Sequence, residues 1–344
     1  MRRVLHVGPA NSAGGMATVM RLLGENPPDG WHSQTIATHC DGSLIAKILV
    51  WQRAKREIRS ILRANSPNRP NVVHIHSAAD WSFTRKSKVM GLCKSAGVPC
   101  ILHIHSGKFD SWLGKPSDRR AIRVRKTIAD TGAKVVVLSD NWAKTLNPLI
   151  GQTQVIVNPI VPVNQHENGI QHSRNKKKIL LMGRPDPVKG ASLAIAATRI
   201  MRANGNEVTL HLTGVTSGHK WSHQAESEGA VIAHGWLSDQ ELEQLRSEVG
   251  LLLVPSAWEG QPMVILEALA RGIPMLVSPV CAEHVGAAGR VVDSKNPDDW
   301  AQEISTLLAD SQALDEMSAA GIKLARSHEI EVVGKQWQEL YESL

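Results

Sequence analysis

The sequence is poor in the side chains that stack on nucleic-acid bases. Aromatic residues make up 4% of the 344 positions, with one Tyr and two Phe, and the ten Trp are scattered along the chain. Proteins that hold single-stranded nucleic acid without sequence preference stack the bases on aromatic side chains. This shortage argues against a nucleic-acid-binding protein, although the net charge of +7 alone would allow one.

Long apolar runs and cysteine motifs are also lacking, and the first residues are not expected to form a secretory leader. No run reaches the ~18 apolar residues that a membrane span needs, and "MRRVLHVG" continues into only a short apolar stretch. The four Cys show no CxxC or zinc-type spacing, which indicates free thiols in a reducing compartment. With 42% hydrophobic residues, the chain is expected to be a soluble, cytoplasmic, globular protein.

Several common motifs are missing. Gly8, Gly14 and Gly15 do not space as GxGxxG, and no Walker A, HExxH or GxSxG sequence occurs. The usual dinucleotide fingerprint, the P-loop and the zincin and α/β-hydrolase signatures are therefore not available to explain the function.

What the sequence does contain is a regular alternation of apolar β-rich runs and helical stretches. Short runs such as "RRVLHV", "NVVHIH", "KKILLM" and "GLLLVP" are separated by helical segments, among them 44–64, 81–96 and 118–131. This pattern predicts parallel sheets covered by helices on both faces. The polar, proline-containing segment 158–178 interrupts it and reads as a linker.

The expected architecture is therefore two Rossmann-like α/β domains. We expect an N-terminal domain over 1–164, a C-terminal domain over 165–328, and a last helix, about 329–343, that could pack back on the N-terminal domain.

Charge is distributed unevenly between these halves. Residues 1–164 hold 23 Lys and Arg against nine Asp and Glu, a net charge of +14, and the remainder is −7. The segment 43–63 adds an apolar surface to several cations, and 119–126 carries five more. Such a segment could lie on anionic lipid, although a helix with a solvated basic face remains the alternative. The N-terminal half is expected to meet an anionic partner, with a membrane surface favoured.

The segment "MGRPDPVKG" places two cations beside a helix start. Arg184 follows an apolar strand, and Lys189 lies where the next helix is expected to begin. Helix N-termini bind anions through free backbone N–H groups. The combination suggests a diphosphate or triphosphate site; a solvated loop with two ordinary cations is the alternative.

A second segment, "EGQPMVILEALARG", contains two carboxylates in an apolar helix. Glu259 precedes the helix at the end of strand "LLLVPS", and Glu267 lies about two turns further on. Ligands of parallel sheets bind at the carboxyl ends of strands, and carboxylates suit sugar hydroxyls, which donate hydrogen bonds. A helix-start charge for Glu259, and a neighbouring backbone group or arginine for Glu267, are the alternatives.

Taken together, these segments resemble the retaining glycosyltransferases of family 4, which have the GT-B fold. The matching pieces occur in family order: "GR" plus four residues plus "KG" at 183–190, "LTG" at 212–214, the segment 234–256, and the E-x(7)-E pair Glu259 and Glu267. Weaker matches reach the N-terminal half at Gly14–Gly15, 102–109, 135–142 and 157–160. The resemblance covers nearly all of 177–278.

The resemblance implies a role for each matching residue. The donor diphosphate would be held by Arg184 and Lys189, with Gly14 and Gly15 allowing close approach. The donor sugar would be held by Glu259, Gly260, Gln261, Pro262 and Met263, the ribose by Glu267, and the base by Trp236 and Leu237. The catalytic candidates would be Glu259 and His105, with His105 across from the sugar. The family also implies a nucleotide-diphosphate-sugar donor, retention of anomeric configuration and no cofactor or metal.

The acceptor is expected to be a lipid-linked or other glycan, in polysaccharide or glycolipid biosynthesis. That expectation, with the basic N-terminal half, places the protein peripherally on the inner face of the cytoplasmic membrane. A nucleotide-sugar epimerase on the same scaffold remains the main alternative function.

Two "HIH" sequences raise the possibility of a metal site. His74 and His76, and His103 and His105, would each present two imidazoles on one face of a strand. No nearby Asp or Glu pattern completes a ligand set, so these are expected to be structural histidines, and a metal-dependent hydrolase is the least supported function.

Overall fold

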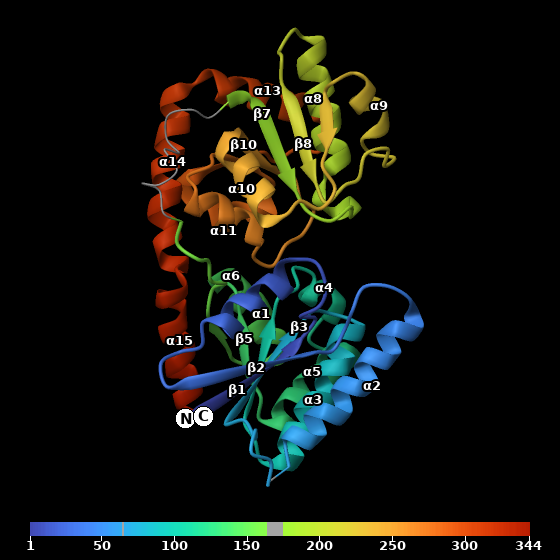
Figure 1. The fold of residues 1–344 in the computed structure, drawn as a ribbon, viewed down its shortest axis with the longest axis vertical. Helices are drawn as coiled ribbons and strands as arrows, with labels where there is room; N and C mark the ends of the chain where they lie inside the picture. The colour runs from blue at the N-terminus through green and yellow to red at the C-terminus, as the bar shows by residue number, and fades with distance from the viewer. Residues whose placement is uncertain (64, 164–174) are drawn as a thin grey trace. The chain divides into compact units, whose positions relative to one another are not determined.

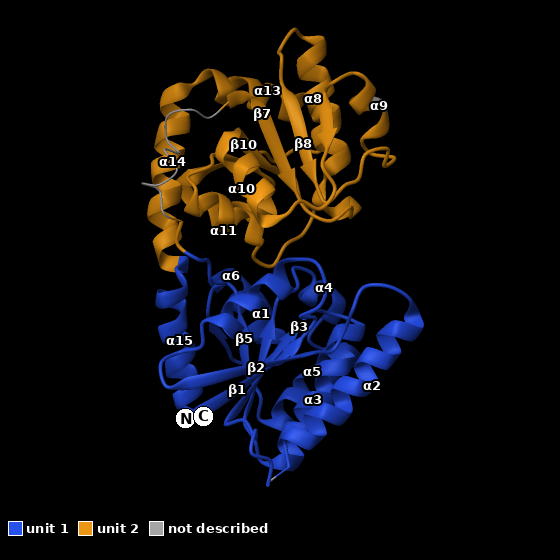
Figure 2. Ribbon diagram, viewed as in Figure 1, with its two compact units in different colours: residues 1–161, 328–344 blue, residues 162–327 orange. Residues whose placement is uncertain are grey.

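The computed structural model describes residues 1–63, 65–163 and 175–344. The chain divides into two compact units, shown in different colours in Figure 2. Unit 1 comprises residues 1–161 and 328–344, and unit 2 comprises residues 162–327. Each unit is built on its own six-stranded parallel sheet, so the predicted fold class, two Rossmann-like α/β domains, is confirmed.

Unit 1 has the strand order β2-β1-β3-β4-β5-β6. Figure 1 shows α2, α3 and α5 together on one side of these strands. The strands are β1 (Arg2–Gly8), β2 (Trp31–Ala37), β3 (Val72–Ser77), β4 (Cys100–Ile104), β5 (Lys134–Val137) and β6 (Thr153–Val155), and the helices are α1 (Gly15–Glu25), α2 (Leu44–Ile61), α3 (Trp81–Ala96), α4 (Phe109–Leu113), α5 (Arg119–Thr131), α6 (Asp140–Ile150) and α15 (Ile330–Glu342).

Unit 2 has the strand order β12-β11-β10-β7-β8-β9. Its strands are β7 (Asn175–Met182), β8 (Thr209–Thr213), β9 (Val231–Ala233), β10 (Val249–Val254), β11 (Met275–Val277) and β12 (Gly289–Val291), and its helices are α8 (Ala191–Ala203), α9 (His223–Ser227), α10 (Asp239–Glu248), α11 (Met263–Ala270), α12 (Ala282–Val285), α13 (Pro297–Ala309) and α14 (Ser311–Ala325).

The central strands of both sheets are buried on both faces, which explains why they read as continuous apolar runs rather than as alternating ones. Every residue of β3, β4 and β10 is buried. The edge strand β2 is different, because three of its seven residues are half-buried and two are exposed. Its mixed sequence "WHSQTIA" gives no clear period, so the sequence did not predict it.

The C-terminal helix α15 packs on the sheet of unit 1. Trp337 is fully buried and Tyr341 is 4% exposed, and their rings lie against His74. Burying a side chain as large as Trp337 stabilises the fold by about 4–6 kcal/mol before entropy is counted. The backbone N–H of Ile330 also donates to Ile160 O at 2.9 Å, which joins the end of unit 1's first segment to this helix.

Some predicted boundaries were wrong. The linker predicted over 158–178 extends too far, because β7 begins at residue 175; residues 164–174 of that prediction lie outside the described residues. The helix predicted over 44–64 ends at Ile61.

Among the described residues, no helix is both long enough and apolar enough to cross a membrane.

Each strand order reverses direction at one point, and this positions the candidate site. In unit 2 the chain runs from β7 outward through β8 and β9, then returns to the other side of β7 as β10. In unit 1 the equivalent point lies between β1 and β3. Ligands of open parallel sheets bind outside the carboxyl ends of the strands at such points.

Candidate functional site

The reversal point of unit 2 carries a pair of opposite charges. Lys189 follows β7, Glu259 follows β10, and these strands are neighbours in the sheet. The Lys189 Nζ donates to Glu259 Oε1 at 2.6 Å, and the side chains are 24% and 10% exposed. The structure therefore brings together the residues predicted for the donor diphosphate and the donor sugar, from segments 70 residues apart.

The backbone around Lys189 is shaped by a close contact. Lys189 ends a 3-10 turn, Pro187–Lys189, that Asp186 caps, and α8 begins two residues later at Ala191. This differs slightly from the expectation that Lys189 starts the helix. Gly190 has φ 74°, and a Cβ there would lie 2.3 Å from the carbonyl oxygen of Pro255. Only glycine fits, so the two loops that carry Lys189 and Glu259 pack directly on each other.

A histidine that was not predicted from the sequence contacts the segment predicted to hold the donor sugar. Buried His284 donates its Nε2–H to the carbonyl oxygen of Gly260 at 2.9 Å. Burial lowers the pKa of His284, so the ring stays neutral at ordinary pH. The sequence could have pointed to His284 as a site residue, because it follows β11, and β11 lies next to β10, the strand that precedes Glu259.

The thiol of Cys281 is affected by the charge of Glu259. Burial, with a further contribution from the Glu259 carboxylate, raises the pKa of the Cys281 thiol to about 12. The residue remains a protonated thiol next to the site and is not suited to nucleophilic chemistry.

Glu267 has an arginine partner. Arg246 of α10 forms an ion pair with Glu267 Oε2, and Arg271 donates to the Glu267 carbonyl oxygen at 2.8 Å. Glu243 completes the group, accepting from Arg271 at 2.6 Å. The apolar helix α11 tolerates its carboxylate because these partners are present. The side chain of Glu267 is still 22% exposed, so ribose binding stays a prediction.

The remaining predicted donor residues lie on loops of unit 2. Arg184 is exposed directly after β7, Trp236 is 63% exposed, and Leu237 is half-buried between β9 and α10. Gln261 is 7% exposed, and Pro262 caps α11 ahead of Met263. No described contact joins Trp236 to the Lys189–Glu259 pair, and its proposed contact with a base stays a prediction.

The predicted residues of unit 1 also follow strand ends. Gly14 has φ 126° and caps α1, which Gly15 begins, in the connection after β1. His105 follows β4, and its backbone N–H donates to Ser77 O at 2.9 Å. The His105 ring lies 3.0 Å from His76, with Nε2 facing His76 Nδ1. The "HIH" pairs face one another as predicted, and His6 of β1 joins them.

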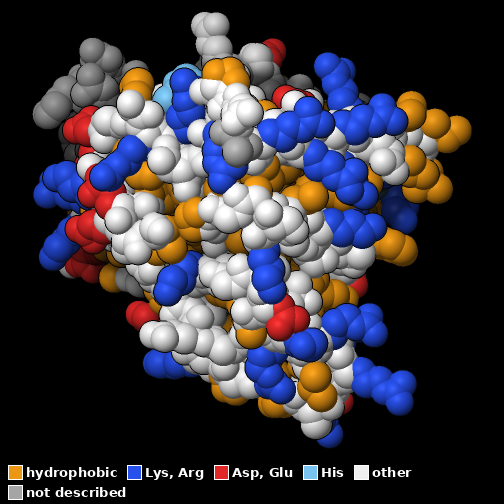
Figure 3. Space-filling view, turned by 90° about the horizontal axis from the view of Figure 1, so that it is seen from below, with side chains coloured by type: hydrophobic (Ala, Val, Ile, Leu, Met, Phe, Trp, Pro, Cys, Tyr) orange, Lys and Arg blue, Asp and Glu red, His pale blue; other side chains and the backbone are white. Residues whose placement is uncertain are grey.

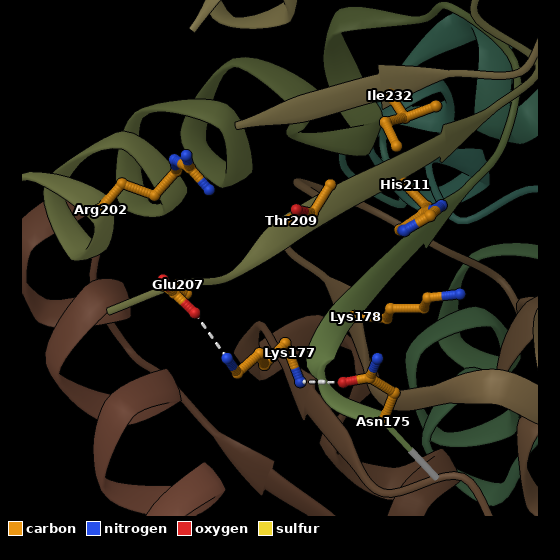
Figure 4. A pocket seen from close by; sticks show the side chains of 8 residues that line it. All are labelled: Asn175, Lys177, Lys178, Arg202, Glu207, Thr209, His211 and Ile232. Carbon is orange, nitrogen blue, oxygen red and sulfur yellow. Dashed lines mark hydrogen bonds and ion pairs between the residues drawn. The ribbon is translucent and has the colours of Figure 1, made fainter. Parts of the chain in front are cut away.

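A cavity of about 460 Å³ lies elsewhere in unit 2, at the amino ends of β7 and β8 (Figure 4). Lys177 and Glu207 point toward each other there, and their charges pair at 2.6 Å. Lys178 pairs with Glu248. Since this cavity opens at the opposite end of the strands from Lys189, we do not assign the donor site to it.

A second cavity, of about 540 Å³, lies in unit 1 where α3 and α5 begin. Trp81, which is 78% exposed, and Trp112 contribute aromatic surface, and Arg120 and Arg123 contribute positive charge. Asp80 also lines it and is the one non-glycine residue with positive φ, 59°, among residues 1–63, 65–163 and 175–344. Backbone strain of this kind concentrates at functional sites.

Comparisons with known proteins show what the chain is similar to. Residues 176–310 match the family model described as glycosyl transferases group 1. The chain is 25% identical over 305 residues to an uncharacterised 41.2 kDa protein from the cps region of Klebsiella pneumoniae, covering 81% of each chain. It is 26% identical over 235 residues to glycogen synthase of Mycobacterium tuberculosis, covering 65% of this chain and 54% of that one. The chain thus spans about half the length of that synthase.

Among solved structures, the chain is similar to Anabaena HepE in complex with UDP. The TM-score is 0.72 at 16% identity, over all of both chains. At this low identity the likeness shows the fold alone. That fold is the GT-B fold, with two Rossmann-like domains. The family model thus supports a likeness to group 1 glycosyl transferases over residues 176–310.

Proposed function

We propose that this chain transfers a sugar from a nucleotide-diphosphate donor to an acceptor hydroxyl, with retention of anomeric configuration and without a metal in the transfer step. The observation that carries the proposal is the Lys189–Glu259 pair at the reversal point of the unit 2 sheet. Support also comes from the UDP and UDP-glucose complexes of similar structures and from the group 1 family match.

The donor end of the site follows from charge and hydrogen bonding. Lys189 and Arg184 are proposed to bind the diphosphate, so that Lys189 exchanges its carboxylate partner for phosphate oxygens. Glu259 is then free to accept hydrogen bonds from hydroxyls of the donor sugar. Cations placed against the leaving diphosphate stabilise the charge that develops as the glycosidic bond breaks, which is the usual role of such groups in phosphate chemistry.

His105, Gly14 and Gly15 are the proposed contributions of unit 1. His105 is half-buried at the carboxyl end of the sheet, and burial lowers the pKa of its ring to about 3. A neutral imidazole there can donate or accept one hydrogen bond but brings no charge. His105 is therefore proposed to orient a hydroxyl rather than to bind phosphate.

A lipid-linked glycan is the proposed acceptor, reached from the surface of an anionic membrane. Four apolar side chains in the first turns of α2 are exposed: Leu44 by 73%, Ile45 by 71%, Ile48 by 50% and Leu49 by 63%. Exposed cations follow on the same helix at Arg53, Arg56 and Arg59. Figure 3 shows Lys and Arg side chains spread over one face of the molecule, with hydrophobic side chains gathered at one edge. Apolar residues beside cations suit a peripheral helix on anionic lipid.

Analysis of the reaction product tests the proposed chemistry. The purified protein is incubated with a nucleotide sugar and an extract of membrane lipids, and the anomeric proton of the product is examined by NMR. We expect a lipid-extractable product with the donor's anomeric configuration and release of the nucleoside diphosphate. Inversion would contradict the proposed stereochemistry, and conversion of the donor to an isomeric nucleotide sugar without transfer would establish the epimerase instead.

A further inference from the structure

Five imidazoles meet on one face of the unit 1 sheet, beneath α15. They come from three adjacent strands: His6 from β1, His74 and His76 from β3, and His103 and His105 from β4 and the residue after it. His6, His74, His76 and His103 are at most 1% exposed, and His105 is half-buried. Two overlapping groups of three have ring nitrogens within 4.8 Å of one another.

One hydrogen-bonded chain in this cluster ends at an unpaired nitrogen. Tyr341 Oη lies 2.8 Å from His74 Nδ1, and His74 Nε2 lies 3.0 Å from His103 Nδ1. His103 Nε2 is buried and has no hydrogen-bond partner. A neutral imidazole has one donor and one acceptor nitrogen, so either direction of the chain leaves His103 Nε2 unmatched. Leaving a buried polar atom unmatched is unfavourable.

A second chain runs beside the first. His6 Nδ1 lies 3.1 Å from His76 Nε2, and His76 Nδ1 lies 3.0 Å from His105 Nε2. None of the five imidazoles forms an ion pair with an acidic side chain in the part of the chain that the structure describes. Burial lowers the pKa of every one of them. All five are therefore neutral at ordinary pH, and neutral imidazole is the form that binds metal ions.

We propose that His76, His103 and His105 bind a divalent transition-metal ion of the zinc class. The assignment uses the unpaired nitrogen of His103 together with the His76 and His105 nitrogens that face each other. Imidazole is a preferred ligand of Zn²⁺, and three histidines with one open position form a familiar coordination set. A tetrahedral ion with Zn–N distances of about 2.0–2.1 Å needs nitrogens roughly 3.3 Å apart. One ring nitrogen from each of these three residues lies within 4.8 Å of the others, and His76 Nδ1 and His105 Nε2 are 3.0 Å apart.

The other residues of the cluster are arranged as supporting partners. Histidines that bind metals almost always donate their second ring N–H to a neighbour, which fixes the tautomer. Here His103 Nδ1–H can donate to His74 Nε2, and His74 Nδ1–H to Tyr341 Oη. His76 Nε2–H can donate to His6 Nδ1. In this arrangement every bond has one donor and one acceptor, and His103 Nε2 presents a lone pair.

The proposed metal site lies in unit 1 and shares one residue, His105, with the proposed transfer function, but its test measures metal binding alone. It makes His105 a ligand, so His105 cannot hold a metal and contact a substrate hydroxyl at the same moment. The half-buried position of His105 is also the route by which an ion could enter.

Titration of the chelator-treated full-length protein with ZnCl₂, followed by calorimetry, tests the proposal. We expect one Zn²⁺ per chain for the unmodified protein and no saturable binding for His103→Phe, which keeps a buried ring but removes both nitrogens. Tyr341→Phe should fold and should weaken binding by about 10–100-fold, as expected for loss of a supporting partner.

The matched control is His234→Phe. His211 and His234 form a pair of stacked imidazoles with Nδ1 and Nε2 2.9 Å apart, but no third histidine of the described residues joins them. The Zn²⁺ affinity of the His234→Phe variant should equal that of the unmodified protein. Absence of saturable binding in the unmodified protein, or equal affinity in His103→Phe, overturns the proposal. If His103→Phe does not fold, an unchanged affinity in Tyr341→Phe overturns it instead.

Discussion

At the scale of single residues, the account depends on Lys189 and Glu259. Their ion pair is mostly enclosed, and the Lys189 ammonium donates a hydrogen bond to the Glu259 carboxylate. Under the proposed function, a ligand offers an anion to Lys189 and hydroxyl donors to Glu259. A nucleotide-diphosphate sugar offers both within one molecule.

Replacing Lys189 by Met should lower kcat/KM for the nucleotide-sugar donor by about 100-fold or more, because a cation at the leaving diphosphate is lost. Glu259→Gln should give a similar loss by weakening the hold on the sugar. Steady-state kinetics would measure both. The control is Lys177→Met, which removes an ion pair of equal length at the opposite end of the strand and should leave turnover unchanged. Near-normal turnover in Lys189→Met would remove that residue from the site.

Glu267 and Arg246 should be coupled in stability. Their side chains are 22% and 11% exposed, so removing either partner leaves a poorly solvated charge. We expect Glu267→Gln and Arg246→Met each to lower the free energy of unfolding by about 1–3 kcal/mol. In a double-mutant cycle measured by urea unfolding, their coupling energy should exceed that of Arg199 and Glu228.

Arg199 and Glu228 are the matched control because they form a bidentate pair at the surface, 41% and 44% exposed. Surface pairs contribute about 0–1 kcal/mol. Equal coupling energies for the two pairs would mean that the Arg246–Glu267 contact does not stabilise α11.

Some of these residues could be predicted from the sequence alone and others could not. Spacing and resemblance selected Lys189, Glu259 and Glu267, because each lies in a motif next to a strand end or within a helix. Arg246 and His284 were not predicted as site residues. Their partners are 21 and 24 residues away along the chain, and only the folded topology brings them together.

At the scale of elements, the buried strands and several long helices could be predicted from the sequence, but the edge strand β2 could not. The helix over 81–96 was predicted at its observed bounds, since a glycine in the left-handed region ends it. The edge strand β2 was missed because its exposed residues are polar. The "HIH" sequences showed that four imidazoles could share one face, but the fifth, His6, needed the observed pairing of β1 with β3.

The helix α2 carries the prediction about membranes. Replacing Leu44, Ile45, Ile48 and Leu49 together by Ser should abolish co-sedimentation with phosphatidylglycerol vesicles at low salt, because the apolar surface that enters the lipid is removed. These positions are exposed, so each change should alter stability by no more than about 0.5 kcal/mol. Exposed Val280 and Val332, replaced by Ser, serve as controls. If the unmodified protein ignores such vesicles at low salt, the membrane proposal fails.

At the scale of the whole molecule, a fall in pH should lower the stability of the chain, in part through the buried histidines of unit 1. Burial lowers the pKa of His6 to about 3 and lowers those of His74, His76 and His103 well below 6.5. Above pH 6.5 these histidines are neutral in both the folded and the unfolded chain. As the pH falls from 6.5 toward 3, the unfolded chain takes up protons that the folded chain does not, so the free energy of unfolding decreases.

Each such histidine contributes up to about 1.4 kcal/mol per pH unit in this range. Urea unfolding at pH 7.5, 6.0 and 5.0 should therefore show a steep loss of stability below pH 6.5. His6→Phe, which removes one of these groups, should make the dependence shallower by up to about 1.4 kcal/mol per pH unit. Stability that does not change between pH 7.5 and 5.0 would contradict the buried, neutral state of the cluster.

The central claim is that unit 2 binds a nucleotide-diphosphate sugar at Lys189 and Glu259, and a thermal-shift panel tests it most directly. UDP-, GDP- and ADP-sugars are each added to the unmodified protein, to Lys189→Met and to Lys177→Met. A donor present at 100 times its Kd should add about 2.7 kcal/mol of stability. We predict that one nucleotide class raises the Tm of the unmodified protein and of Lys177→Met but not that of Lys189→Met. No shift with any nucleotide sugar, or an equal shift in Lys189→Met, would contradict the account.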